Sequence, residues 1–236
     1  MNDEGKLGGT PESQAVAERY ARRRVADPRY SILNPDVWMT LQERQRAVLR
    51  RFAAQGLDLP GVRLLEVGCG EGGNLLELMR MGFVPERLIG VELIEARFDV
   101  ARSRLPQALQ LHLGDAVAMD LPNASQDIVF VSTVFSSILD ASTQHALAAA
   151  MWRWLRPGGS VLWYDFTVDN PRNPDVRGVP RARLAELFPE GQLRAQRVTL
   201  APPIARRVCR LHPALYTVFN TIPLLRTHLL AWITKS

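Results

Sequence analysis

The chain has 236 residues, of which 47% are hydrophobic and 22% charged, and its formal net charge is +5. This composition excludes the disordered and fibrous classes, and the length predicts one substantial hydrophobic core with room for a small lid. No stretch approaches the apolar length of a membrane span, and Asp3 and Glu4 stand where a signal peptide would be basic. The sequence therefore predicts a cytoplasmic protein.

The basic residues are almost all arginines, because Lys6 and Lys235 are the only lysines. Codon bias in a GC-rich genome and selection for anionic partners explain this equally well. The two cysteines, Cys69 and Cys209, have no metal-ligand spacing and give no disulfide framework.

Two helices are predicted before the first strand. The first runs from about residue 12 to residue 25, where Asp27-Pro28 breaks it, and its arginines form either a solvated face or a nucleic-acid contact. The second begins at Asn34-Pro35, an N-cap followed by proline at the first helical position, and Gly56 ends it.

The most informative stretch is residues 64–75, in which an aliphatic run containing Glu66 passes into clustered glycines and then becomes amphipathic with helical spacing. Glycine allows a positive φ and the close approach of a ligand, so this pattern predicts a strand, a ligand-binding turn and a helix. Gly68, Gly70 and Gly73 also match the dinucleotide pattern G-x-G-x-x-G. Glu66 favours a different ligand, because a carboxylate there repels a pyrophosphate and attracts an ammonium group.

The segment Glu66-Val67-Gly68-Cys69-Gly70 resembles motif I, E-x-G-x-G, of the class I S-adenosylmethionine-dependent methyltransferases. The resemblance implies a methyltransferase domain over residues 58–236 and an N-terminal helical lid over residues 1–57. Tyr30 and Trp38 are then expected either near the cofactor or in the helix packing. For motif I itself, the resemblance implies that S-adenosylmethionine is bound by Glu66, Gly68, Cys69, Gly70 and Asn74.

Two further acids follow predicted strands. Residues 87–93 form the second strand, in which Glu92 can accept two hydrogen bonds from a ribose of S-adenosylmethionine or NAD, with Leu93 beside it. A helix follows over residues 94–105. The third strand, residues 109–113, leads into Asp115 and Ala116, which the resemblance assigns to the adenine amino group and ring. The alternative for Asp115 is a capping aspartate.

The fourth strand, residues 128–131, is a continuous apolar run that we expect to be buried on both faces. The residues after it begin with Ser132, which we expect beside the cofactor. They lack the N/D-P-P-Y/F signature of methyltransferases that act on nucleic-acid bases and the aspartate of metal-dependent catechol-type enzymes. Base methylation and a magnesium site are therefore disfavoured. A helix from Ser142 ends in residues 155–159, L-R-P-G-G, a turn typical of the family, before a fifth strand over residues 160–166.

The last third departs from a minimal methyltransferase. A turn-dense loop and a short helix precede two predicted strands, residues 192–200 and 227–235, which a long connection joins. The resemblance implies an α/β fold with a seven-stranded sheet of order 3-2-1-4-5-7-6, strand seven antiparallel, flanked by helices. Insertions at about residues 167–190 and 201–226 then border the methyl donor and either recognise substrate or cover the sheet edge. Residues 213–232 are apolar enough to rest on a membrane surface, although a packed helix and an edge strand fit better.

A hydroxyl acceptor is helped by a group that takes its proton. The candidates at the expected edge are His228, Asp165, Tyr164 and Asp169, although a lone histidine is more often structural. An anionic substrate could be held bidentately by arginines that otherwise order the loops through salt bridges. These arginines are Arg177, Arg207 and Arg226.

The sequence therefore predicts an enzyme that transfers a methyl group from S-adenosylmethionine to a small-molecule or glycan-like acceptor, at oxygen. The alternatives are a non-catalytic S-adenosylmethionine-binding partner subunit and, from the basic charge, an RNA methyltransferase. A nicotinamide oxidoreductase is disfavoured by Glu66. No metal is expected, nucleic acid is a disfavoured partner, and peripheral membrane contact stays open.

Overall fold

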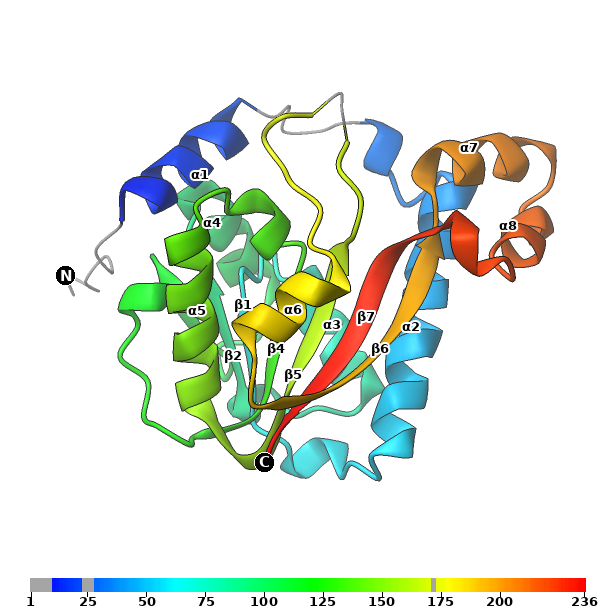
Figure 1. Ribbon diagram of the computed structural model, residues 1–236. Coiled ribbons are helices and arrows are strands. Elements are labelled where there is room, and N and C mark those ends of the chain that lie inside the picture. The colour runs from blue at the N-terminus through cyan, green and yellow to red at the C-terminus, as the bar shows by residue number, and fades with distance from the viewer. Residues whose placement is uncertain (1–9, 23–27, 171–172) are drawn as a thin grey trace.

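The computed structural model describes residues 10–22, 28–170 and 173–236. Its seven strands form one sheet in the order β3-β2-β1-β4-β5-β7-β6 (Figure 1). β7 is antiparallel to both of its neighbours, and the other pairs are parallel. The strand order and the antiparallel β7 that the resemblance implies are confirmed. The strands are β1 Leu64–Val67, β2 Leu88–Glu92, β3 Gln110–Leu113, β4 Gln126–Ser132, β5 Leu155–Phe166, β6 Gly191–Leu200 and β7 Arg226–Lys235.

The central strands are buried on both faces, which explains their continuous apolar runs. Along β4, Ile128 and Phe130 pack with one core cluster, whereas Val129 and Val131 pack with another. This alternation follows from the two-residue period of a strand, which sends successive side chains to opposite faces.

Helices cover both faces of the sheet. The cluster on one face contains side chains of α2, α3 and α4, and the cluster on the other contains side chains of α5 and α6. A smaller third cluster joins the N-terminal half of α2 to α7 and α8. Figure 1 shows α5 and α6 in front of the sheet and α3 behind it. The helices are α1 Pro11–Ala21, α2 Pro35–Ala54, α3 Gly73–Met81, α4 Glu95–Arg104, α5 Ala141–Trp154, α6 Arg181–Leu187, α7 Pro202–Leu211 and α8 Ala214–Phe219.

Both N-terminal helices exist, with differences at their ends. α1 ends at Ala21 rather than near residue 25, and the predicted break at Asp27 lies outside the described residues. Asn34 is the N-cap of α2 by position, but its side chain makes no capping hydrogen bond. The side-chain amide of Asn34 instead donates to Pro28 O (2.8 Å), so it orders the segment that precedes α2.

Two predictions about the sheet need correction. The L-R-P-G-G turn is the start of β5 itself, where the register with β4 shifts between Gln126 and Ile128. The edge strand expected within residues 213–232 is wrong, because β7 lies between β5 and β6, as the predicted strand order requires. The connection over residues 201–226 is mostly helical, in α7 and α8.

Candidate functional site

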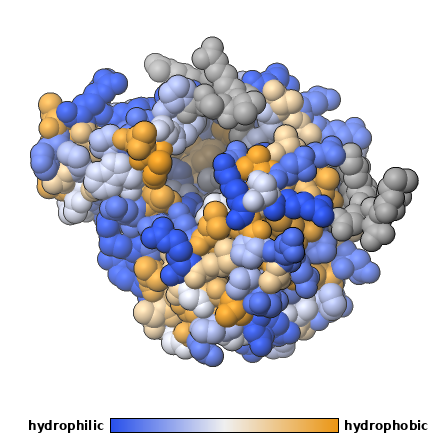
Figure 2. All heavy atoms as spheres, turned by 180° about the vertical axis from the view of Figure 1, so that it is seen from behind, coloured by the Kyte–Doolittle hydropathy of each residue, from blue (hydrophilic) through white to orange (hydrophobic). Residues whose placement is uncertain are grey.

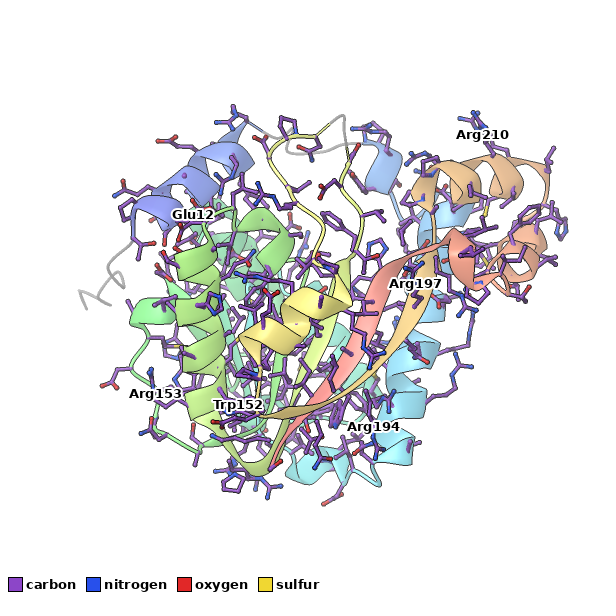
Figure 3. The ribbon with its side chains drawn as sticks, viewed as in Figure 1. Glu12, Trp152, Arg153, Arg194, Arg197 and Arg210 are labelled. Atoms are coloured by element: carbon purple, nitrogen blue, oxygen red, sulfur yellow. The ribbon has the colours of Figure 1, made fainter. Side chains whose placement is uncertain are left out.

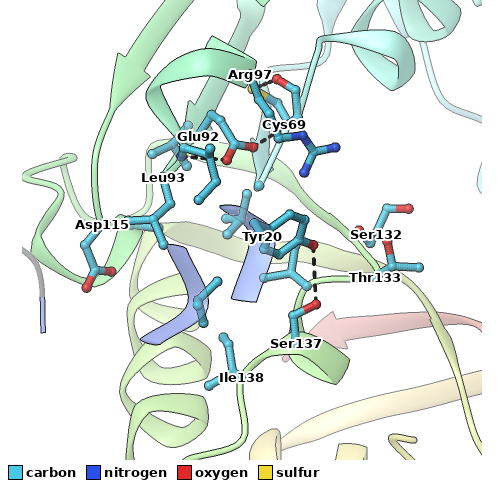
Figure 4. Close-up of a pocket in the computed structure, with 18 of the residues that line it drawn as sticks. Tyr20, Cys69, Glu92, Leu93, Arg97, Asp115, Ser132, Thr133, Ser137 and Ile138 are labelled. Atoms are coloured by element: carbon cyan, nitrogen blue, oxygen red, sulfur yellow. Dashed lines mark hydrogen bonds between the residues drawn. The ribbon is translucent and has the colours of Figure 1, made fainter. Parts of the chain in front are cut away.

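A cavity of about 470 Å³ lies where β1, β2, β3 and β4 end (Figure 4). The carboxyl ends of parallel strands are the usual ligand position in an open α/β sheet. Of the ten residues predicted to contact the cofactor, Glu66 lies behind the cavity wall. The other nine line the cavity: Gly68, Cys69, Gly70, Asn74, Glu92, Leu93, Asp115, Ala116 and Ser132. Their contact with a cofactor stays a prediction.

The turn after β1 needs glycine for conformation and for space. Gly68 and Gly70 have φ of +67° and +59°, in the left-handed region that side chains rarely adopt. A Cβ on Gly68 would lie 2.5 Å from Val134 Cγ2. The N–H groups of Gly68 and Cys69 both donate to Val91 O, at 2.8 and 3.0 Å. The turn is thus tied to the end of β2, and these two amides point into the protein.

Glu66 at the end of β1 is fully buried. Its Oε1 accepts a hydrogen bond from Asn74 Nδ2 (2.6 Å), whereas its Oε2 has no partner among the described residues. Burial raises the pKa of Glu66 to about 8, so the carboxyl is mostly protonated at pH 7. Arg44 of α2 lines the cavity and donates to Asn74 Oδ1 (2.7 Å). One end of the cavity therefore brings a cation, an amide and a buried acid together.

Glu92 and Asp115 are both buried, and both accept hydrogen bonds from backbone N–H groups. Glu92 accepts from Gly70 N–H (2.7 Å) and from Ile94 N–H (2.8 Å), so it fixes the glycine turn as well as facing the cavity (Figure 4). Asp115 accepts from Val117 N–H (2.9 Å), which is the capping role considered as the alternative. Its second oxygen accepts from the hydroxyl of Ser13.

α1 closes one side of the cavity with residues that the sequence did not point to. Ser13 and Tyr20 line it, and the Tyr20 hydroxyl lies 3.3 Å from Ser137 Oγ (Figure 4). The guanidinium of Arg97, from α4, lies 5.2 Å from the centre of the Tyr20 ring. Ser13 and Tyr20 are more than 40 positions from motif I in the sequence, so no local pattern links them to it.

Tyr30 and Trp38, considered for the cavity, lie elsewhere. Tyr30 is exposed, and Trp38 packs against the cluster of α2, α7 and α8. The helix-packing interpretation therefore holds for Trp38 and neither interpretation holds for Tyr30.

The residues predicted as proton acceptors do not line the cavity. Asp165 accepts from the backbone N–H groups of Ser136 (3.0 Å) and Phe166 (2.9 Å), and burial raises its pKa to about 7. The Tyr164 hydroxyl is hydrogen-bonded to Thr199 Oγ1 (2.9 Å), and burial raises the pKa of Tyr164 to about 12. Asp169 accepts from Gly178 N–H (2.7 Å). These contacts order the edge of the sheet.

The three arginines predicted to bind substrate also lie away from the cavity lining. Arg226 donates to Asn220 O (2.7 Å) and Arg197 O (3.1 Å), so it orders the chain around the start of β7. Arg177 and Arg207 are exposed.

Replacing His228 by phenylalanine should change how stability depends on pH. The ring stacks on Tyr164, with centroids 5.0 Å apart, and burial lowers the pKa of His228 to about 4. In the unfolded chain a histidine titrates near pKa 6.5, so the folded protein should lose stability as the pH falls from about 6.5 towards 4. Between pH 7 and pH 4.5 the unchanged protein should lose about 2 kcal/mol more unfolding free energy than His228→Phe. Urea unfolding at both pH values measures this, and equal losses would contradict it.

Comparisons with known proteins agree with the fold. Residues 64–159 match a family model described as a methyltransferase domain. Over 119 residues the chain is 35% identical to malonyl-[acyl-carrier protein] O-methyltransferase of Serratia marcescens, covering 50% of this chain and 44% of that protein. Over 172 residues it is 31% identical to fatty-acid O-methyltransferase of Mycolicibacterium smegmatis, covering 65% of this chain and 59% of that protein. The chain thus spans about half the length of these curated relatives.

A solved structure extends the likeness to almost the whole chain. It is a methyltransferase of Thermotoga maritima described as a possible histamine N-methyltransferase, with a TM-score of 0.64 at 17% identity, covering 94% of this chain and 99% of that one. At this identity the likeness shows the fold alone. Together with the family model and the strand order, these findings show that the chain contains a class I S-adenosylmethionine-dependent methyltransferase domain.

Proposed function

We propose that this chain transfers the methyl group of S-adenosylmethionine to an oxygen of a small-molecule acceptor. The proposal rests on the hydrogen bonds that the backbone N–H groups of the glycine turn make. Gly68 and Cys69 donate to Val91 O and Gly70 donates to Glu92, so these N–H groups are engaged within the protein. A dinucleotide would need such amides for its pyrophosphate. The turn therefore supports a ligand without phosphates.

The charges at one end of the cavity match the methionine part of S-adenosylmethionine, which carries an ammonium and a carboxylate. We assign Arg44 to the carboxylate, because it lines the cavity and an arginine fork suits carboxylates. We assign Glu66 to the ammonium, one hydrogen bond behind Asn74.

The other two carboxylates suit the nucleoside. Glu92 would hold the ribose hydroxyls and Asp115 the adenine amino group. A carboxylate oxygen has two lone pairs, so the contacts that these side chains make to backbone leave capacity for a ligand. Leu93, Ala116 and Ile138 line the cavity and offer apolar surface to the adenine ring.

S-adenosylmethionine supplies a methyl carbon already activated by positively charged sulfur. The protein then has to place the acceptor in line with that carbon and to exclude water. α1, with Ser13 and Tyr20 over the cavity, supports the lid proposed for residues 1–57. α2 also packs in the sheet core through Ala47, Val48 and Phe52, so we restrict the lid to α1.

The cavity favours an acceptor that needs no base. None of the described residues that line it is a histidine or a lysine. Of its four carboxylates, Glu92 and Asp115 are assigned to the nucleoside, and Glu12 and Glu71 form ion pairs with Arg19 and Arg104. A carboxylate oxygen is ionised at pH 7 and attacks without losing a proton. The names of two relatives, which specify O-methyltransferases for malonyl-[acyl-carrier protein] and fatty acid, support such an acceptor. We therefore propose methyl ester formation on an organic acid.

Radiolabelled S-adenosylmethionine tests this function in a host extract separated into small-molecule, lipid, glycan, protein and RNA fractions. We expect label in the small-molecule or lipid fraction that alkali releases as volatile methanol, because methyl esters hydrolyse and methyl ethers do not. Gly70→Val should give no label, and Arg153→Gln, on the exposed side of α5, should label like the unchanged protein. Alkali-stable label would contradict the ester, label in RNA would contradict the acceptor class, and binding without label would favour the non-catalytic subunit.

A further inference from the structure

The segment between β6 and β7, residues 201–226, folds into a separate lobe made of α7, α8 and a turn at Pro223–Leu225. Leu200 and Arg226 are paired in the sheet, so both ends of the lobe leave the same edge of the sheet. Because β6 is parallel to β5, this edge is also the one at which the cavity lies. Figure 1 shows the lobe projecting to the side beyond β6.

The lobe exposes large apolar side chains. Of the ten large hydrophobic residues that are exposed in the described chain, five belong to these 26 residues: Leu211, Val218, Phe219, Ile222 and Leu224. Leu211 is 81% exposed and Leu224 is 84% exposed. Four of the five fall within seven consecutive residues, 218–224. Scattered exposed leucines are ordinary, but a concentration of this kind marks an interaction surface.

The exposed apolar side chains of the lobe are separate from its core, which is fully packed. Ala205, Val208 and Cys209 on the inner face of α7 are buried, and Tyr216 of α8 is buried with them against Met39 of α2. The Tyr216 hydroxyl accepts a hydrogen bond from Leu200 N–H (3.3 Å), which ties the lobe to β6. The lobe is thus packed on its inner side and apolar on its outer side.

The lobe carries positively charged side chains and no acidic ones. Residues 201–226 contain four arginines and no aspartate, glutamate or lysine. Arg207 and Arg210 lie on the exposed face of α7, one turn apart and next to Leu211. Figure 3 shows Arg210 pointing outward from α7, and Figure 2 shows the lobe at upper left with apolar and charged surface side by side.

We propose that this lobe docks on an anionic lipid bilayer, with residues 218–224 in the boundary between headgroups and acyl chains. An anionic bilayer complements both features of the lobe. Its acyl chains offer an apolar layer for the exposed side chains, and its headgroups offer a negative surface for Arg207 and Arg210. No helix in the described ranges is long and apolar enough to cross a membrane, so this contact would be peripheral. The proposal does not depend on methyl transfer, although docking at this edge would bring lipid-borne acids towards the cavity.

Sedimentation with vesicles tests the proposal on the full chain. We expect binding to vesicles of phosphatidylglycerol and phosphatidylcholine in 0.15 M salt, and much weaker binding to phosphatidylcholine alone. Reversing both charges, Arg207→Glu with Arg210→Glu, should weaken binding about 30-fold or more, because each arginine near such a surface contributes about fivefold. Ile222→Ser with Leu224→Ser should weaken it about tenfold or more, through lost apolar burial.

Two variants control for general effects of charge and polarity. Leu49→Ser changes an exposed leucine of α2 about three turns beyond Trp38, and Arg194→Glu reverses an exposed charge on β6. Both should bind vesicles within about twofold of the unchanged protein. The proposal is overturned if anionic vesicles bind no protein, if neutral vesicles bind as well, or if the lobe and control variants behave alike. It is also overturned if light scattering shows a dimer that Ile222→Ser with Leu224→Ser dissociates.

Discussion

Replacing Glu66 by glutamine should weaken the binding of S-adenosylhomocysteine about 30-fold or more and should remove a proton release that accompanies binding. The loss follows from deleting one partner of a buried charge pair, which costs about 2 kcal/mol or more. The proton has a separate cause. Burial raises the pKa of Glu66 to about 8 in the free protein, so at pH 7 the group is mostly protonated. An ammonium beside it favours the carboxylate, so binding should release close to one proton.

Calorimetry in two buffers with different ionisation enthalpies counts that proton. Below pH 8 the association constant of the unchanged protein should rise by up to about tenfold per pH unit, and that of Glu66→Gln should stay nearly flat. Glu86→Gln, at an exposed position in Pro85–Arg87, is the matched control and should keep both the affinity and the proton release. If Glu66→Gln releases as many protons as the unchanged protein, Glu66 does not hold the ammonium.

Replacing Gly70 by valine should abolish detectable binding of the same ligand, a loss of at least about 100-fold. Gly70 has φ of +59°, where a β-branched residue is strained, and its N–H holds Glu92. A Cβ at this position would lie 2.7 Å from the guanidinium of Arg97. That group is the end of a flexible side chain, so we expect the fold to survive with about 1–3 kcal/mol less stability.

Gly56 provides a control for strain alone. It has φ of +60° after α2, and a Cβ there would have nothing within 4 Å. Gly56→Val should lose stability for the same backbone reason and keep its affinity, because Gly56 does not line the cavity. Thermal unfolding and calorimetry on both variants separate the two effects. Unchanged affinity in a folded Gly70→Val protein would show that the turn does not border the ligand.

The parts of this protein that could be predicted from the sequence are those with local causes. Strands such as β4 are short continuous apolar runs because both of their faces are covered. The turn after β1 needs residues without a Cβ, so the glycines that mark it in the sequence mark it in space too. Nine of the ten predicted cofactor residues line the cavity for this reason: each is the last residue of a strand or lies in the turn or helix that follows it, and parallel strands end at one edge.

Side-chain direction and distant contacts could not be predicted from the sequence. Asp165 and His228 lie at the edge of the sheet that borders the cavity, as predicted. However, Asp165 accepts a hydrogen bond from the backbone of Ser136, and His228 stacks on Tyr164. A sequence indicates the strand, whereas packing and the register with its neighbours decide what each side chain meets.

The sequence by itself determined the family, the strand order that the family implies and the motif that borders the cavity, because these depend on residues close together along the chain. Only the tertiary structure decided which groups complete that cavity. Ser13, Tyr20 and Arg44 reach it from helices that precede the first strand. Packing against α2 decided which side of the lobe of residues 201–226 is buried and which stays exposed. Contacts of this kind depend on how whole helices pack on the sheet, and no local pattern of residues encodes them.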